Sequence, residues 1–358
     1  MKRFLSSRDE IVYLVKISFM GNNSNTLHDG RKNKNDEFYT CFEDIENELA
    51  NYSDKFVNKT VYCNCDDPLK SNFTRYFLEN FKRLGLNRLI SSFYCIDGEG
   101  SSYALIYDGQ YEGLDPDDIC RKSDLIVPLS ADDGFDTSDI ETSWKNGAYG
   151  AGDFRSYKCV SLLKDSDIVV TNPPFSLFRD LIKLLTKYDK KYLLIGNTNV
   201  ITYKEIFPLI KEGKLWLGCT NFNVGMMFIV PDSFERFHHI DENGNKIARV
   251  STSCWWTNIN NERKSKSIKL EKSVSDINME TYDDYDAVNV DNVKDIPSDY
   301  YGKIGVPITF LNKHNPEQFD IVGKLVNGSG EEFYDFGPPI VNGKMKYARL
   351  IIQRKKPL

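Results

Sequence analysis

A tetrapeptide, Asn172-Pro173-Pro174-Phe175, holds the residue types with the clearest chemical use. It follows the apolar run 167–171, and a short β-branched run before an Asn-Pro-Pro turn predicts a buried strand that ends in a rigid loop. Both prolines fix their own φ angle, and Pro173 restricts Asn172 to an extended conformation. Because neither proline has an N–H group, the loop presents mainly carbonyl acceptors. Such acceptors, an amide and an aromatic face suit a flat ring with an exocyclic amine, which indicates methylation of a base taken out of its stack.

The segments around this tetrapeptide alternate between predicted helices and predicted strands, judged from the spacing of apolar residues. Helices are predicted at 42–52, 73–84, 161–164 and 177–188, and strands at 61–63, 88–94, 167–171 and 192–195. Such alternation is typical of an α/β fold with a doubly wound parallel sheet. A long acidic stretch at 97–150 interrupts it, and there we expect a small hairpin at 103–107 and little other regular structure. A connection of that length is either functional or an insertion.

The pattern becomes β-rich after about Gly213. Strands are predicted at 215–217, 226–230, 253–258, 306–311 and 349–353, with Asn-Gly turn signals at 243–244, 327–328 and 342–343. Trp255 and Trp256 are expected to pack in the core. Residues 1–33 form a predicted flexible arm, because much of this segment is polar and rich in Asn and Gly. The pattern thus predicts an arm, an α/β core and a smaller, mostly β lobe.

The composition is that of a globular protein with a sizeable core, at 358 residues, 41% hydrophobic content and a formal charge of −6. A negative charge is unusual for a nucleic-acid binder but does not exclude one, because steering depends on where the charges lie. The 8 cysteines are scattered without a CxxC pair, which indicates reduced thiols and a cytoplasmic location. We expect no membrane-spanning segment and no metal site, since no apolar run is long enough and no histidine frame is present.

Several separated blocks resemble the EcoRI-type adenine-N6 DNA methyltransferases, the modification enzymes of restriction systems. The blocks are DEFYT (36–40), VYCNCDDP (61–68), GDFRS (152–156), SDIVVTNPPFSLF (166–178), ITYKE (201–205) and GVPITFLNKHNPEQF (305–319). The resemblance runs from about residue 34 to the C-terminus, and 97–150 departs from it most. It implies a class I AdoMet-dependent methyltransferase with a Rossmann-like sheet. The implied domains are a catalytic domain at 34–262, with 97–150 as a long insertion, and a mostly β target-recognition lobe at 263–358.

The resemblance implies a catalytic role for all four residues of the tetrapeptide. The Asn172 side-chain oxygen and the Pro173 carbonyl would accept the two hydrogens of the adenine N6 amine, which aims the nitrogen lone pair at the methyl donor. Pro174 would fix the turn, and Phe175 would stack on the flipped base. The alternative is a tight strand-to-helix turn without chemistry.

The resemblance also implies a site for S-adenosyl-L-methionine (AdoMet), the methyl donor. Tyr39 and Thr40 would lie beside its methionine end, where the alternative is an ordinary start of a helix. Asn64, Asp66 and Asp67 belong to the loop after the first strand, in place of the Gly-rich loop of common AdoMet enzymes. Either Asp66 or Asp67 would accept from the AdoMet ammonium group, and the sequence leaves this choice open. An Asx turn is the alternative for that loop.

At the other end of the cofactor, Asp153 resembles the acid that accepts from the amino group of the AdoMet adenine, and Phe154 would pack against that ring. A surface turn is the alternative. Asn172 would also border the cofactor. The ribose would need an acid near the end of the second strand, and Asp97 lies near that place.

The implied partner is double-stranded DNA, bound by a monomer, with a cognate restriction endonuclease as a further partner. We expect phosphate contacts from Arg263, Lys264 and Lys266 on charge alone, while a solvated basic face is the alternative. Two other functions remain open from the sequence. One is a catalytically inactive DNA-binding decoy. The other is a methyltransferase of RNA bases or protein glutamines, although those enzymes carry a Gly-rich first loop that is absent here.

Overall fold

The computed structural model describes residues 38–94, 102–129, 149–261 and 266–356, in two compact units. The first unit holds the described residues up to Gly196 together with Val224–Trp255, and the second holds Asn197–Asn223 and the residues from Trp256 onward. Residues 197–223, which the sequence assigned to the catalytic domain, therefore cluster with the C-terminal part of the chain. The predicted arm at 1–33 lies outside the described residues.

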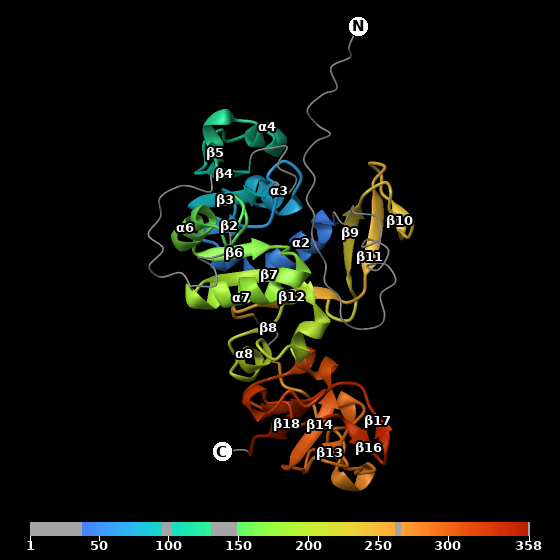
Figure 1. Cartoon of the computed structure of the whole chain (residues 1–358). Coiled ribbons are helices and arrows are strands. Elements are labelled where there is room, and N and C mark those ends of the chain that lie inside the picture. Colours follow the sequence, from blue (N-terminus) through green and yellow to red (C-terminus); the bar gives the residue numbers. More distant parts are fainter. Residues whose placement is uncertain (1–37, 95–101, 130–148, 262–265, 357–358) are drawn as a thin grey trace. The chain divides into compact units, whose positions relative to one another are not determined.

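A mixed sheet forms the centre of the first unit (Figure 1), with the strand order β5-β4-β3-β2-β6-β7-β12. Its four central strands are parallel neighbours: β2 (Thr60–Cys63), β3 (Arg88–Phe93), β6 (Ile168–Thr171) and β7 (Lys191–Asn197). Nearly every residue of these strands is buried, as expected for a sheet covered on both faces. The predicted strands at these positions are thus confirmed. Strand β12 (Ser253–Thr257) follows β7 in the order and buries Trp255 and Trp256, as predicted.

The helices of this unit begin and end where local signals place them. They are α2 (Phe42–Leu49), α3 (Asn72–Glu79), α6 (Tyr157–Asp165) and α7 (Phe178–Lys187). Helix α6 begins earlier than predicted because Ser156 caps it by accepting from the N–H of Cys159. Each helix buries one apolar stripe, such as Phe73, Tyr76 and Phe77 of α3.

Residues 102–129 contain more regular structure than the sequence indicated. Strand β4 (Tyr103–Tyr107) pairs antiparallel with both β3 and β5 (Ile126–Pro128), and α4 (Pro116–Cys120) lies between β4 and β5. The prediction of little beyond a local hairpin is therefore wrong for this segment. The reason is that β4 pairs with the strands before and after it across long connections, and such pairing leaves no local turn signal. Residues 130–148 lie outside the described part.

A second, smaller sheet of the first unit has the order β1-β9-β11-β10 (Figure 1). Its strands are β1 (Tyr39–Thr40), β9 (Met226–Val230), β10 (His239–Ile240) and β11 (Lys246–Val250). The predicted Asn243-Gly244 turn joins β10 to β11 and is held by Asp241, which accepts from the N–H groups of Asn243 and Asn245. Beside β1, the Phe38 ring lies edge-on to Phe228 and Phe234.

The second unit contains a four-stranded sheet of its own with the order β13-β14-β18-β15. The strands are β13 (Val288–Asn289), β14 (Lys303–Pro307), β15 (Phe319–Leu325) and β18 (Arg349–Arg354). The predicted strand at 306–311 is wrong beyond Pro307, because Ile308–Lys313 form a 3₁₀ helix. The turn at Asn342-Gly343 is confirmed: both residues have positive φ and join β16 (Ile340–Val341) to β17 (Lys344–Met345).

The second unit also contains a short helix, α8 (Phe207–Lys211), and strand β8 (Trp216–Leu217), which pairs with the last residues of β12. Its core includes Tyr282, Leu325, Val341 and Ile351. Within the described ranges, none of the helices has the length and apolar character that crossing a membrane requires.

Candidate active site

The strand order of the main sheet reverses between β2 and β6. From β2 the chain moves to β3 on one side, and it later returns to β6 and β7 on the other side. Loops at the carboxyl ends of parallel strands flank a crevice at such a switch point, and ligands of open α/β sheets bind there. The loop after β2 carries Asn64 to Asp67, and the loop after β6 begins with Asn172. The structure therefore brings two of the predicted motifs to one edge of the sheet.

Asn172 is fixed with its amide oxygen unpaired. Its Nδ2 donates to the carbonyl of Phe38, at 3.4 Å, while Oδ1 is buried and has no partner within the described residues. The carbonyl of Pro174 accepts from the N–H of Leu177 at 2.8 Å, which starts a 3₁₀ turn, and the half-buried ring of Phe175 lies in that turn. The arrangement presents a desolvated acceptor beside an aromatic ring.

Asp66 has protein partners on both carboxylate oxygens. Its Oδ2 accepts from the hydroxyl of Thr171 at 2.5 Å, and Oδ1 accepts from the hydroxyl of Ser71 at 2.7 Å. The backbone N–H of Asn172 faces the same carboxylate and lowers its pKa. Burial raises the pKa of Asp66 to about 7, against the opposing effect of these donors.

Asp67 differs from its neighbour because one of its oxygens is unpaired. Oδ1 accepts from the N–H of Leu69 and from the hydroxyl of Tyr103, both at 3.0 Å. Oδ2 is buried and has no partner in the described part of the chain. Burial raises the pKa of Asp67. Sequence reasoning missed Tyr103, because its role depends on the pairing of β4 with β3, which brings the two segments together.

Two further predicted residues also present unpaired polar atoms. The Nδ2 of Asn64 and the Oγ1 of Thr40 are both buried and lack partners among the described residues. Thr40 follows Tyr39 in β1, and its carbonyl accepts from the side chain of Asn72 at 2.8 Å, which ties β1 to α3. A buried polar atom without a partner costs about 1–3 kcal/mol, so several at one edge of a sheet indicate a place for a polar ligand.

Asp153 lies on a turn held against the end of β3. Gly152 has φ of +91°, and a Cβ there would collide with the carbonyl of Phe93 and with the side chain of Ser102. Asp153 accepts from Arg155 three times, from Nε at 3.0 Å, Nη2 at 2.8 Å and the backbone N–H at 2.9 Å.

The side chain of Arg155 connects this turn to its surroundings. Its Nη1 lies 3.2 Å from Asp180 of α7, and its guanidinium lies 4.3 Å from the centre of the Tyr149 ring. Phe154 is buried beside it, with its ring 5.3 Å from the same guanidinium. Arg155 stands in the GDFRS block, but no sequence signal indicated a role for this residue.

The remaining predicted residues are less informative. Lys266 is exposed, and Arg263, Lys264 and Asp97 lie outside the described residues. Within the described ranges, no three His, Cys, Asp or Glu side chains gather as a metal would require. His238 and His239 are exposed, with their Nδ1 atoms 2.9 Å apart. The Cys63 and Cys65 thiols have pKa values well above the usual range because of burial and the nearby Asp66.

The family and the relatives that this chain matches are all methyltransferases. The family described as the adenine-specific methyltransferase EcoRI matches residues 26–355. The type II methyltransferase M.EcoRI of Escherichia coli is 45% identical, over 92% of this chain and 96% of its own. M.MpnI of Mycoplasma pneumoniae is 34% identical, over 91% of this chain and 97% of its own. M.MgeORF184P of Mycoplasma genitalium is 33% identical, over 91% and 98%. No solved structure matches the chain significantly.

Proposed function

The chain belongs to the adenine-specific methyltransferase EcoRI family, and we propose that it methylates the N6 atom of an adenine flipped out of duplex DNA. The observation that carries this proposal is the unpaired, buried Oδ1 of Asn172 at the switch point of the sheet. A buried amide oxygen without a partner is stabilised when a donor binds to it, and the N6 amine of adenine supplies such a donor. The products would be N6-methyladenine and S-adenosylhomocysteine.

The reaction requires the protein mainly to orient the adenine N6 amine toward the methyl group. Asn172 Oδ1 and the Pro173 carbonyl would accept the two N6 hydrogens, which draws the nitrogen lone pair out of the ring and toward the methyl group. Phe175 would stack on the extruded adenine, for about 1–3 kcal/mol. When bound, AdoMet supplies an electrophilic methyl group on sulfonium. Methylation leaves the nitrogen with one positive charge, which it loses by releasing one proton to water, because the two carbonyl acceptors are too weakly basic to keep that proton.

The unpaired atoms near β1 and β2 fit the methionine end of AdoMet. Its ammonium group would donate to Asp67 Oδ2, and its carboxylate would accept from Asn64 Nδ2 and Thr40 Oγ1, beside Tyr39. Each of these contacts would satisfy an atom that is otherwise buried without a partner. Asp66 has no unpaired oxygen to offer, so of the two acids we assign the ammonium contact to Asp67.

The turn at 152–154 fits the adenine end of AdoMet. A carboxylate has about four acceptor sites. Asp153 uses three of them for Arg155, so one remains for the amino group of the cofactor. Phe154 would border the ring. The strand order with β2 and β6 at the switch point supports a class I, Rossmann-like methyltransferase sheet.

The second unit is the proposed target-recognition lobe, because it has a sheet and a hydrophobic core of its own. We assign it base readout, and we assign phosphate contacts to Arg263, Lys264 and Lys266. We propose that the protein acts as a monomer that modifies one strand per binding event. A cognate restriction endonuclease as a further partner fits the names of the relatives, which are type II methyltransferases. GAATTC is a candidate recognition site, although small changes in such a lobe alter base readout.

The test is transfer of labelled methyl groups from AdoMet to unmethylated genomic DNA, followed by sequencing of modified bases. The expected result is N6-methyladenine at one recurring site. Asn172→Ala should bind AdoMet and DNA as the wild type does but lose at least about 100-fold in kcat. Asn51→Ala, an exposed amide elsewhere in the unit, is the matched control.

The alternatives give different results in the same assay. Label in RNA or protein instead of DNA would favour a methyltransferase of RNA bases or glutamines. A protein that binds DNA but not AdoMet would be a decoy. Normal turnover by Asn172→Ala would contradict the proposed role of the tetrapeptide.

A further inference from the structure

We propose that Asp66 is a positioning residue that holds the catalytic Asn172 in place, and that it does not bind the cofactor. This inference rests on the proposed function and assigns a role within the same site. Its basis is the contrast between two adjacent acids: Asp67 keeps an unpaired oxygen, whereas Asp66 uses both oxygens within the protein.

The contacts of Asp66 bridge two loops that are far apart in the sequence. Thr171, 105 residues further on, donates to Oδ2 at 2.5 Å. The backbone N–H of the next residue, Asn172, faces the same carboxylate and lowers its pKa. One side chain therefore fixes the end of β6 at the residue where the catalytic tetrapeptide begins.

Asp66 is itself anchored at two other points. Ser71, which donates to Oδ1, is the N-cap of α3 and accepts from the N–H of Phe73 at 3.1 Å. The Asp66 carbonyl accepts from the hydroxyl of Ser91 in β3 at 2.9 Å, and Ser91 lies 2.7 Å from the hydroxyl of Thr74. The carboxylate is thus tied to α3 and, through its backbone, to β3, so it is a rigid support.

The consequence concerns the direction of the Asn172 amide. Asp66 holds Thr171, the residue before Asn172, and the Phe38 carbonyl holds the Nδ2 of Asn172 at 3.4 Å. With both held, Oδ1 points at a fixed position. Displacement of a reacting group by about 1 Å costs on the order of 100-fold in rate, so a loose loop would lower kcat without weakening the affinity for AdoMet.

The substitution Asp66→Asn should preserve the fold but weaken the hydrogen bonds that hold the end of β6 in place. Asp66, Asp67, Cys63 and Cys65 are the titratable groups that face one another here, and burial of the Asp66 carboxylate is costly. Asp66→Asn removes that buried charge. It also replaces an acceptor oxygen with an NH₂ group, which has no lone pair for a hydroxyl or N–H donor. Three donors then compete for one oxygen.

The experiment compares Asp66→Asn and Thr171→Val with Thr171→Ser, which keeps the hydroxyl and serves as the matched conservative variant. Turnover is measured at saturating AdoMet and DNA, AdoMet Kd by calorimetry, and folding by thermal melting. We expect Asp66→Asn and Thr171→Val to lower kcat about 10- to 100-fold, with AdoMet Kd within about twofold of the wild-type value. Thr171→Ser should retain nearly full kcat. The double variant should be no slower than the slower single variant, because both remove one contact.

Other outcomes would overturn the inference in distinguishable ways. A large rise in AdoMet Kd with normal kcat at saturation would make Asp66 a cofactor ligand. Unchanged kinetics in both Asp66→Asn and Thr171→Val would show that the bridge is not needed. A wild-type protein that transfers no methyl group to DNA would instead overturn the proposed function, and this inference with it.

Discussion

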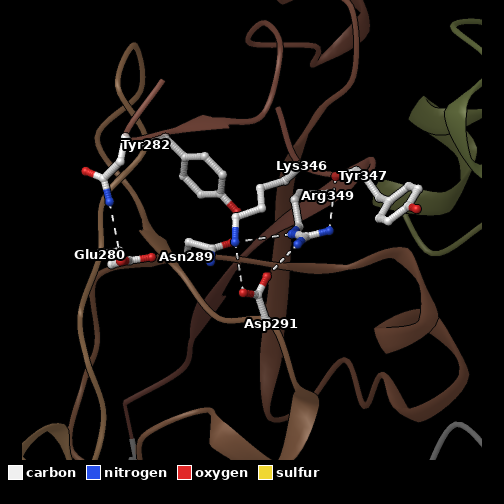
Figure 2. A network of polar contacts seen from close by, with 8 residues as sticks. Glu280, Tyr282, Asn289, Asp291, Lys346, Tyr347 and Arg349 are labelled. Carbon is white, nitrogen blue, oxygen red and sulfur yellow. Dashed lines mark hydrogen bonds and ion pairs between the residues drawn. The ribbon is translucent and has the colours of Figure 1, made fainter. Parts of the chain in front are cut away.

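Buried polar groups are paired differently in two regions of the molecule, the network around Arg349 in the second unit and the candidate site in the first. In the second unit, Arg349 donates to Asp291 at 2.6 Å, to the Tyr347 carbonyl at 3.0 Å and to Asn289 at 3.4 Å, as Figure 2 shows. Tyr282 also donates to Asn289, at 2.9 Å. In the candidate site of the first unit, by contrast, four side chains have a buried polar atom without a partner among the described residues: Thr40, Asn64, Asp67 and Asn172.

Under the proposed function, the difference separates polar groups that support the fold from polar groups that bind a ligand. A buried network whose members are all paired makes a fold specific and rigid, whereas one with unpaired members carries a cost that a ligand relieves. A cavity of about 320 Å³ lies beside the network of the second unit and is lined by polar residues that include Lys272, Asn289 and Asp291. Two of the four acids in this lining have cationic partners, since Asp291 pairs with both Lys346 and Arg349, and Asp295 pairs with Lys272. The volume of this cavity alone therefore does not indicate that a ligand binds there.

The largest effect is expected where a paired charge in the second unit loses its partner. Lys324 and Asp335 lie 3.3 Å apart with side chains 2% and 0% exposed. Asp335→Ala should lower the free energy of unfolding by about 3–5 kcal/mol, because it leaves Lys324 buried and uncompensated. Denaturant titration measures this. The control is Glu271→Ala in an exposed pair with Lys269, where about 0–1 kcal/mol is expected. Equal effects in the two variants would contradict the distinction.

The pH dependence of stability should report on Asp66. Its folded pKa, about 7, lies above the ordinary value of 3.8, so between these values the folded state holds a proton that the unfolded state has lost. Stability should therefore fall as pH rises from about 4 to about 7, by up to about 4 kcal/mol from this group. Asp66→Asn should flatten that slope in melting curves recorded across the range. A slope identical to that of the wild type would show that Asp66 is not the titrating group.

Removal of an unpaired group should weaken binding and leave stability intact. Asp67→Asn should raise AdoMet Kd about 10- to 100-fold, because a charge-assisted contact to the ammonium group is lost. Its melting temperature should stay the same or rise, since a buried carboxylate disappears. Calorimetry and thermal melting on one sample measure both quantities. Normal AdoMet binding by this variant would show that a residue other than Asp67 accepts from the ammonium group.

The smallest effect is expected for a single neutral hydrogen bond in the paired network. Tyr282→Phe should cost about 1 kcal/mol of unfolding free energy through the lost bond to Asn289. Methyl transfer per folded molecule should not change. A loss of DNA methylation without loss of stability would instead give this network a functional role.

The sequence by itself determined the central strands of the main sheet and the shape of the loop at 172–175. Apolar spacing located β2, β3, β6 and β7, because their buried residues form short continuous runs. Two prolines after an Asn restrict the backbone wherever they occur, so the shape of that loop is a local property. The Asn-Gly turns at 243–244 and 342–343 are local for the same reason.

Only the tertiary structure decided which polar atoms are paired. Asp66 and Asp67 are adjacent and chemically identical, and they differ because Thr171 reaches one while Tyr103 reaches a single oxygen of the other. Those partners are brought together by the parallel pairing of β2 with β6 and by the antiparallel pairing of β4 with β3. Pairing across long connections is also the reason that β5, and the partners of the predicted β segment at 103–107, escaped prediction. Hydrogen bonds between distant segments leave no periodic trace in a sequence, whereas burial and turns do.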